Sequence, residues 1–195
     1  MMGGNPFFTQ PRPGLDEKIF KLIKFRSMSN KKDERGNLLS DEERLNGYGK
    51  FLRSTSLDEL PELINILKGD MSFVGPRPQL VRDMVFMSDE IRLRHTAKPG
   101  LTGLAQAKGR NAIAWEDKFR WDLQYIDRIT FATDCEIVFK TIIDLIKAVL
   151  GKGNSQETDI TDDYGDYLLK QGVINKDEYD IKQAMAISIL KDAGC

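Results

Sequence analysis

Two adjacent carboxylates, Asp58 and Glu59, lie where the sequence predicts the start of a helix, in the run Ser-Leu-Asp-Glu-Leu-Pro at 56–61. Proline lacks a backbone N–H and is tolerated in the first turn of a helix, so Pro61 places the helix start at position 57 or 58. Gly69 is typical of a left-handed cap after the last turn. The free N–H groups at a helix N-terminus favour an ionised carboxylate, as a nucleophile or a Mg²⁺ ligand requires.

A purely structural interpretation of these acids stays open. Ser56 and Glu59 have the spacing of a capping box, which would stabilise the helix by about 1 kcal/mol. The helix also carries an apolar stripe at i, i+3, i+4 and i+7, a spacing that predicts burial against a core. The stripe consists of Leu60, Leu63, Ile64 and Leu67.

Arginines lie on both sides of the acid pair in the chain. Arg53 precedes it, and Arg77 follows it between Pro76 and Pro78. Because two prolines restrict the backbone around Arg77, its guanidinium is aimed before a ligand arrives, which suits bidentate phosphate binding. The alternative for Arg77 is a surface turn residue paired with a nearby acid.

The run 53–78 resembles the core signature of the bacterial sugar transferases, the monotopic phosphoglycosyl transferases. It reads Arg-Ser-Thr-Ser-Leu-Asp-Glu-Leu-Pro-Glu-Leu-Ile-Asn-Ile-Leu-Lys-Gly-Asp-Met-Ser-Phe-Val-Gly-Pro-Arg-Pro. Further matching motifs lie before this run, at 9–14 and 24–28, and after it, at 98–106 and 109–111. The resemblance therefore covers roughly residues 7–150.

This resemblance implies transfer of a phosphosugar from a UDP-sugar to polyprenyl (undecaprenyl) phosphate, with release of UMP, as the first step of glycan or glycoconjugate assembly. Asp58 would be the nucleophile that forms an aspartyl-phosphosugar intermediate, Glu59 would assist it, and both acids would bind Mg²⁺. Lys24 could instead be a solvated residue at a strand edge, with no role near the substrate phosphates. The residues expected around the substrate are Lys24, Arg53, Pro76, Arg77, Gln106 and Arg110.

The order of patterns along the chain predicts an α+β fold that is mainly helical, with a few short strands or hairpins. We expect a catalytic domain at 1–150, a linker at 151–163 and a small helical hairpin at 164–195 that contacts a second copy or a protein partner. Within the first domain we expect a strand over 18–28, an exposed loop or hairpin over 29–47, and helices over 79–96, 112–128 and 133–150. The last of these has a wide apolar arc, which the core, a membrane interface or a partner would cover.

Composition narrows the function classes. The 29 basic and 30 acidic residues nearly cancel, and 24 basic against 21 acidic side chains over 1–150 is too small an excess to indicate nucleic-acid binding. Two cysteines provide no disulfide framework. His95, the only histidine, is a second acid–base candidate without an evident carboxylate partner.

The sequence contains no run of 18 apolar residues, whereas the family carries an N-terminal hydrophobic helix that enters the membrane. We therefore expect a catalytic domain without its anchor, working at the cytoplasmic face of the bacterial inner membrane. Two other functions stay open: a soluble Mg²⁺-dependent sugar-nucleotide hydrolase, and a non-catalytic scaffold associated with a membrane.

Overall fold

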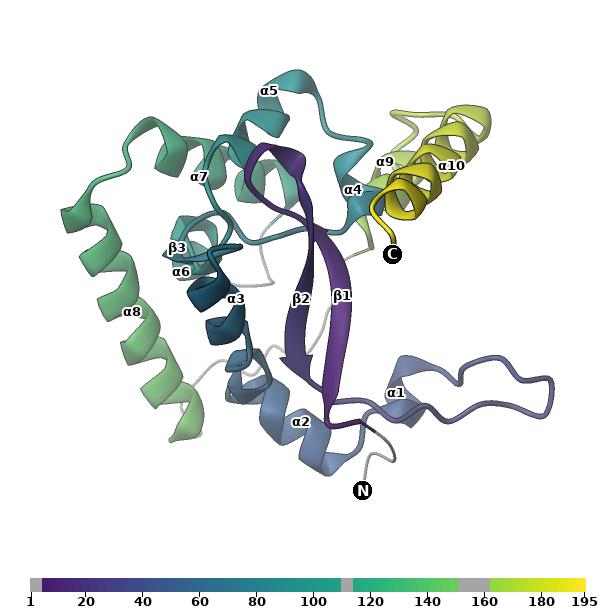
Figure 1. Ribbon diagram of the computed structural model, residues 1–195, viewed down its shortest axis with the longest axis horizontal. Helices are drawn as coiled ribbons and strands as arrows, with labels where there is room; N and C mark the ends of the chain where they lie inside the picture. Colours follow the sequence, from purple (N-terminus) through teal and green to yellow (C-terminus); the bar gives the residue numbers. More distant parts are fainter. Residues whose placement is uncertain (1–4, 110–113, 151–161) are drawn as a thin grey trace.

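A computed structural model describes residues 5–109, 114–150 and 162–195 (Figure 1). Helices of very different lengths surround two small sheets, which confirms the predicted α+β, mainly helical fold class. The described strands are β1 (Phe7–Pro13), β2 (Ile19–Phe25), β3 (Ser72–Val74) and β4 (Gly100–Thr102). The described α-helices are α1 (Asp41–Arg44), α2 (Gly47–Ser54), α3 (Glu62–Lys68), α4 (Val81–Met84), α5 (Asp89–Arg92), α6 (Leu104–Gly109), α7 (Trp115–Asp127), α8 (Phe131–Val149), α9 (Tyr164–Lys170) and α10 (Lys176–Asp192). Three 3₁₀ turns join them: η1 (Leu15–Glu17), η2 (Leu57–Glu59) and η3 (Leu93–Thr96).

Strands β1 and β2 form an antiparallel hairpin that runs through the middle of the molecule (Figure 1). Its register pairs Phe7 with Phe25 at the open end and Pro13 with Ile19 beside the turn. The strand predicted over 18–28 is therefore confirmed. The following segment forms the extended arm at the right of Figure 1, as expected of an exposed loop, with a single bridge between Lys32 and Leu38.

Strands β3 and β4 pair in parallel and hold the start of the Gly-Pro-Arg-Pro turn. The Gly75 N–H donates to the Thr102 carbonyl at 2.9 Å, and the Gly100 N–H donates to the Pro76 carbonyl at 3.1 Å. A Cβ on Gly100 would lie 2.1 Å from the Gly75 nitrogen. These glycines therefore let two backbone segments touch, which fixes where the turn begins.

The largest buried cluster brings helices α4, α7, α9 and α10 together. Trp115, Phe119 and Tyr164 pack against one another in it in tilted and edge-to-face arrangements, with ring centroids 4.9–5.4 Å apart. The Tyr164 N–H donates to the buried Asp83 carboxylate at 2.9 Å. Helices α9 and α10 thus pack on the same core as α4 and α7.

The predicted turn between the two C-terminal helices forms as expected. Gly172 has a φ of 69°, and bonds from Gly172 to Leu169 and from Val173 to Leu168 close a Schellman motif. Asn175 caps α10 by accepting the Glu178 N–H at 2.8 Å. The predicted linker, in contrast, falls mostly on residues 151–161, which lie outside the described residues.

Three predictions about helices are wrong. The segment 57–68 is broken into η2 and α3 at Pro61, and the segment 79–96 is broken into α4, α5 and η3 because Ser88 caps a new helix by accepting the Ile91 N–H. The apolar stripe of the first segment is not buried. Its four side chains are 38–88% exposed: Leu60, Leu63, Ile64 and Leu67.

Helix α8 confirms the helix predicted over 133–150, and its apolar arc is also largely uncovered. Ile137 is its only buried residue, whereas Phe139, Ile142 and Ile146 are about half exposed or more. No helix within the described ranges combines the length and the apolar content needed to cross a bilayer.

We predict that Gly100→Ala destabilises the protein by about 3 kcal/mol, because the new methyl group would overlap the Gly75 backbone. Urea unfolding followed by circular dichroism measures this loss. The matched control is Gly47→Ala at the start of α2, where a Cβ meets nothing within 4 Å and alanine favours the helix by up to about 1 kcal/mol. Equal midpoints for the two variants would contradict the close approach of β3 and β4.

Candidate active site

Glu59 is the side chain around which the polar site is built. Its Oε1 accepts a hydrogen bond from Arg77 Nη2 at 2.6 Å and another from Lys24 Nζ at 2.9 Å. The glutamate comes from η2, the arginine from the turn after β3, and the lysine from β2. One carboxylate oxygen therefore joins three segments that are distant in the sequence.

Both partners keep Glu59 charged. Burial opposes ionisation of this carboxyl, but Arg77 and Lys24 outweigh it and lower the pKa of Glu59 to about 2. The pKa of Arg77 is raised, chiefly by the charge of Glu59. Glu59 therefore remains an anion at every pH at which the fold is expected to persist.

Asp58 is the carboxylate that stays available. It is half-buried, and within the described residues its side chain makes no hydrogen bond or ion pair. Burial and the neighbouring Glu59 raise its pKa, while Lys24, Arg53 and Arg77 oppose that rise. Three cationic side chains therefore act on Asp58, and among the described residues none of them forms an ion pair with it.

The local backbone explains this division between the two acids. Ser56 adopts a left-handed conformation with φ of 56° and makes no capping bond, so the capping-box interpretation is wrong. The Glu59 carboxylate points to Arg77 instead of returning to the Ser56 backbone. The expectation that a helix N-terminus keeps Asp58 ionised is also wrong, because η2 is one 3₁₀ turn and α3 begins only at Glu62.

Two residues of α3 that sequence reasoning missed complete the network. Glu62 is 2% exposed, and its Oε1 lies 3.1 Å from Lys24 Nζ. Asn65 is 1% exposed; it accepts the Ile23 N–H at 3.0 Å and donates to the Lys21 carbonyl at 2.9 Å. Asn65 thereby fastens α3 to β2 at two positions just before Lys24. A polar residue inside an apolar helix was the signal for it in the sequence.

Comparison with known proteins settles the family. The family model described as "Bacterial sugar transferase" matches residues 1–148. The chain belongs to the bacterial sugar transferase family. It is 46% identical over 160 residues to the uncharacterized sugar transferase EpsL of Bacillus subtilis, covering 82% of this chain and 78% of that protein.

Two further relatives of the sugar transferase carry more specific names. It is 41% identical to a UDP-glucose:undecaprenyl-phosphate glucose-1-phosphate transferase of Klebsiella pneumoniae and 37% identical to an undecaprenyl-phosphate galactose phosphotransferase of Salmonella typhimurium. Each alignment covers 71% of this chain but only 32% and 33% of those proteins. The chain thus corresponds to about a third of each of them.

The other residues predicted to lie around the substrate take different places in the sugar transferase. Arg53, on α2, donates to Ser27 Oγ at 3.0 Å and contributes to the field at Asp58. Pro76 is buried in the turn that presents Arg77. Gln106, on α6, donates to the Leu101 carbonyl at 3.2 Å, and its buried Oε1 lacks a partner among the described residues. Arg110 lies outside the described residues.

His95 has the carboxylate partner that the sequence did not reveal. Its Nδ1 lies 3.2 Å from Glu17 Oε1, and Glu17 also pairs with Arg92. Burial lowers the pKa of His95 to about 4. The imidazole is therefore neutral at physiological pH, and it faces η1 rather than the acid pair.

The donor set of the site fits a magnesium ion only in part. Within the described residues there is no cluster of three or more side chains able to hold a metal, and Oε1 of Glu59 is already shared by two cations. Mg²⁺ commonly binds through one or two carboxylates together with substrate phosphates. Asp58 has the free oxygens for such a site, whereas Glu59 would have to contribute its other oxygen.

We predict that Glu59→Gln lowers the free energy of unfolding by about 2 kcal/mol near neutral pH, since it removes the anion between Arg77 and Lys24. A depressed folded-state pKa adds stability above the ordinary value of 4.5, and that stability is lost as the pH falls towards about 2. The gap between wild type and variant should therefore shrink as the pH falls below 4.5. Urea titrations at a series of pH values measure it.

The control for this titration is Glu34→Gln, which changes an exposed acid of the arm. It should leave unfolding unchanged to within about 0.5 kcal/mol. A Glu59→Gln gap of constant size down to pH 3 would contradict the assigned ion pairs.

Proposed function

We propose that this sugar transferase moves a phosphosugar from a UDP-sugar to a polyprenyl phosphate such as undecaprenyl phosphate, releases UMP, and so initiates glycan or glycoconjugate assembly. The observation that carries the proposal is a carboxylate, Asp58, that is unpaired among the described residues and lies beside Glu59, which is paired with both Arg77 and Lys24. The names of the Klebsiella and Salmonella relatives support the same reaction class.

In the proposed first step, an oxygen of Asp58 attacks the β-phosphorus of the UDP-sugar. The bond from that phosphorus to the bridging oxygen breaks, and UMP leaves with the electron pair. In the second step, an oxygen of the lipid phosphate attacks the same phosphorus and releases the Asp58 carboxylate. The products are UMP and a polyprenyl diphosphate sugar, and each step is a single displacement.

A carboxylate nucleophile and a diphosphate repel each other, and the cations of the site would offset this repulsion. Arg77 and Lys24 would stabilise charge that develops on the phosphoryl oxygens. Mg²⁺, held by Asp58 and the free oxygen of Glu59 together with substrate phosphates, would supply further charge neutralisation. With a pKa of about 2, Glu59 suits the role of an anion that holds these cations better than the role of a proton acceptor.

Two other functions make different predictions in the same assay. A sugar-nucleotide hydrolase would release UMP and free sugar phosphate without a lipid. A scaffold would release no UMP at all. Measuring UMP with and without undecaprenyl phosphate separates the three, because only the transferase requires the lipid for turnover.

We predict that Asp58→Asn lowers the rate of UMP release by at least about 10³-fold. The thermal unfolding midpoint should change little, because this side chain makes no ion pair among the described residues. Intact-protein mass spectrometry after incubation with a panel of UDP-sugars should show a phosphosugar adduct on the wild type and none on the variant. An adduct of equal yield on Asp58→Asn would exclude this nucleophile.

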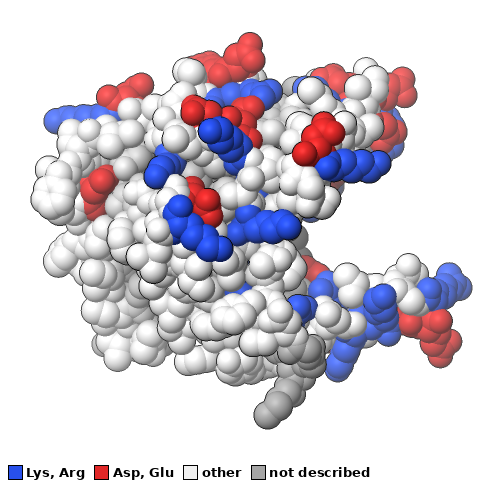
Figure 2. Space-filling model, viewed as in Figure 1, with Lys and Arg blue, Asp and Glu red and all other residues white. Residues whose placement is uncertain are grey.

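We also propose that the sugar transferase sits at the membrane interface, on the cytoplasmic face of the inner membrane. The exposed stripe of α3 lies directly after the acid pair in the chain, and Phe51 of α2 and Phe73 of β3 are also more than half exposed. The lower left of the view in Figure 2, where α8 lies, carries few charged side chains. Such a surface suits a lipid substrate whose phosphate must reach Asp58.

We predict that the double variant Leu63→Glu, Leu67→Glu lowers binding to vesicles with anionic lipid by about tenfold or more without lowering the unfolding midpoint, since Leu67 is 88% exposed. Vesicle sedimentation measures the binding. Val173→Glu, at a residue 67% exposed in the C-terminal turn, is the matched control and should bind as the wild type does. Equal binding by all three proteins would contradict the proposal that α3 contacts the membrane.

The C-terminal helices keep their proposed role as a contact for a second copy or a protein partner. One side of α10 packs on α4, while Ile181 and Met185, one helical turn apart, are 70% and 55% exposed. These two apolar side chains support the proposal.

A further inference from the structure

Another buried ion pair joins η3 to α7, and neither of its residues is assigned to the reaction. Arg94, in η3, and Asp122, in α7, are 1% and 3% exposed. Arg94 donates to Asp122 Oδ2 through Nη2 at 2.6 Å and through Nε at 3.0 Å. Both side chains are thus fully enclosed by protein.

Burying such a pair is an expensive way to join two helical segments. Removing both charges from water can outweigh their attraction, and apolar residues of similar size often pack as well or better. A buried ion pair is therefore weak evidence for stability. The contacts beyond the pair show what else it does.

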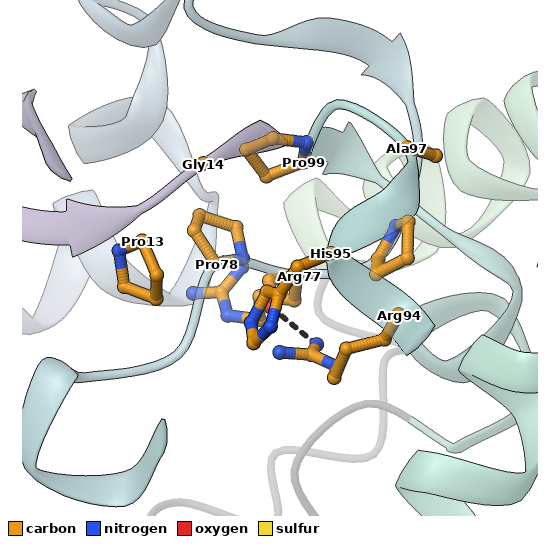
Figure 3. A pocket seen from close by; sticks show the side chains of 9 residues that line it. Pro13, Gly14, Arg77, Pro78, Arg94, His95, Ala97 and Pro99 are labelled. Atoms are coloured by element: carbon orange, nitrogen blue, oxygen red, sulfur yellow. Dashed lines mark hydrogen bonds between the residues drawn. The ribbon is translucent and has the colours of Figure 1, made fainter. Parts of the chain in front are cut away.

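Arg94 makes a third hydrogen bond, to the backbone of the Gly-Pro-Arg-Pro turn. Its Nη2 donates to the carbonyl of Arg77 at 2.7 Å, the bond drawn as a dashed line in Figure 3. Asp122 holds the guanidinium from the side, so the direction of this bond is fixed. The Arg77 residue is consequently bound at both ends: its carbonyl by Arg94 and its guanidinium by Glu59.

The rest of the turn leaves little other support for Arg77. Gly75 and Pro76 are bonded to the β4 segment, and the Pro78 carbonyl accepts Arg12 Nη1 at 3.2 Å. A pocket of about 10 Å³, the size of one water molecule, is lined by the turn together with Arg94, His95 and Pro13. Among the described residues, the bond from Arg94 is the only hydrogen bond to the Arg77 carbonyl, so it is the contact that fixes the orientation of this peptide.

We infer that Arg94 and Asp122 are a positioning pair for Arg77: they hold its carbonyl so that its guanidinium reaches Glu59 and the substrate phosphates. The inference concerns a residue whose role in phosphate binding rests on the proposed function. Its structural part, the effect on the Arg77–Glu59 bond, does not depend on that function.

The test replaces the pair without leaving a buried charge. In the double variant Arg94→Met, Asp122→Leu, apolar side chains fill the site but nothing donates to the Arg77 carbonyl. ¹⁵N NMR of the Arg77 guanidinium near neutral pH, assigned with Arg77→Ala, reports the pairing with Glu59 directly. We expect slowly exchanging Arg77 Nη–H signals in the wild type and their loss in the variant, because a displaced Arg77 no longer donates to Glu59 Oε1.

Calorimetric titration with UDP in the presence of Mg²⁺ gives the second readout. The double variant should bind UDP about tenfold more weakly than the wild type, the effect of one lost hydrogen bond. In an Arg77→Ala background the same double substitution should have no further effect, because it acts only through Arg77. A purely structural pair would instead give losses that add.

Arg92→Gln is the matched control. Arg92 pairs with Glu17 beside η3 but has no bond to Arg77 among the described residues, so this variant should leave the Arg77 signals and UDP affinity unchanged. If the double variant does not fold, Arg94→Lys keeps the charge pair without the fixed fork to the carbonyl and should weaken the Arg77 signals alike.

Unchanged Arg77 signals in the folded variant overturn the inference. If UDP binds neither the wild type nor the variant while the Arg77 signals still change, the proposed function fails and the positioning role stands. The two failures are therefore distinguishable.

Discussion

A single carboxylate oxygen, Oε1 of Glu59, is the point on which the site depends. It accepts Arg77 at 2.6 Å and Lys24 at 2.9 Å, and among the described residues neither cation has another anion as close. The glutamate is therefore a junction between the β-hairpin, the turn after β3 and η2. Asp58 next to it makes no ion pair within the described residues; burial and the charge of Glu59 raise its pKa, and the nearby cations oppose that rise.

A buried polar side chain holds the backbone at or near each cation. Asn65 bonds β2 at Lys21 and Ile23, just before Lys24, while Arg94 bonds the carbonyl of Arg77. Such groups are costly to bury unless every bond is made, so they tolerate one arrangement only. Two of the buried polar side chains thus hold the segments that carry the two long cationic side chains.

Local patterns predicted the elements but not their partners. The long helix α8 follows from periodicity and the Asn175 cap from capping residues within a few positions, whereas the β2 segment mixes apolar and basic residues without a clean period. The stripe of α3 was predicted to be buried because periodicity shows that one face is apolar and cannot show what covers it. The bonds of Glu59 to Arg77 and Lys24 span 18 and 35 residues, and no short pattern encodes them.

The same limit explains why the roles of the two acids could not be separated from the sequence. Adjacent carboxylates look equivalent in the run Ser-Leu-Asp-Glu-Leu-Pro, and a capping box accounts for Glu59 as well as a metal site does. In the structure Ser56 is left-handed and makes no capping bond, Glu59 pairs with two cations, and Asp58 stays half-buried. A nucleophile must approach phosphorus, so the acid bound to two cations is the poorer candidate. The proposed division of roles between the two acids therefore rests on contacts across the fold, which two neighbouring side chains of the same charge do not reveal in the sequence.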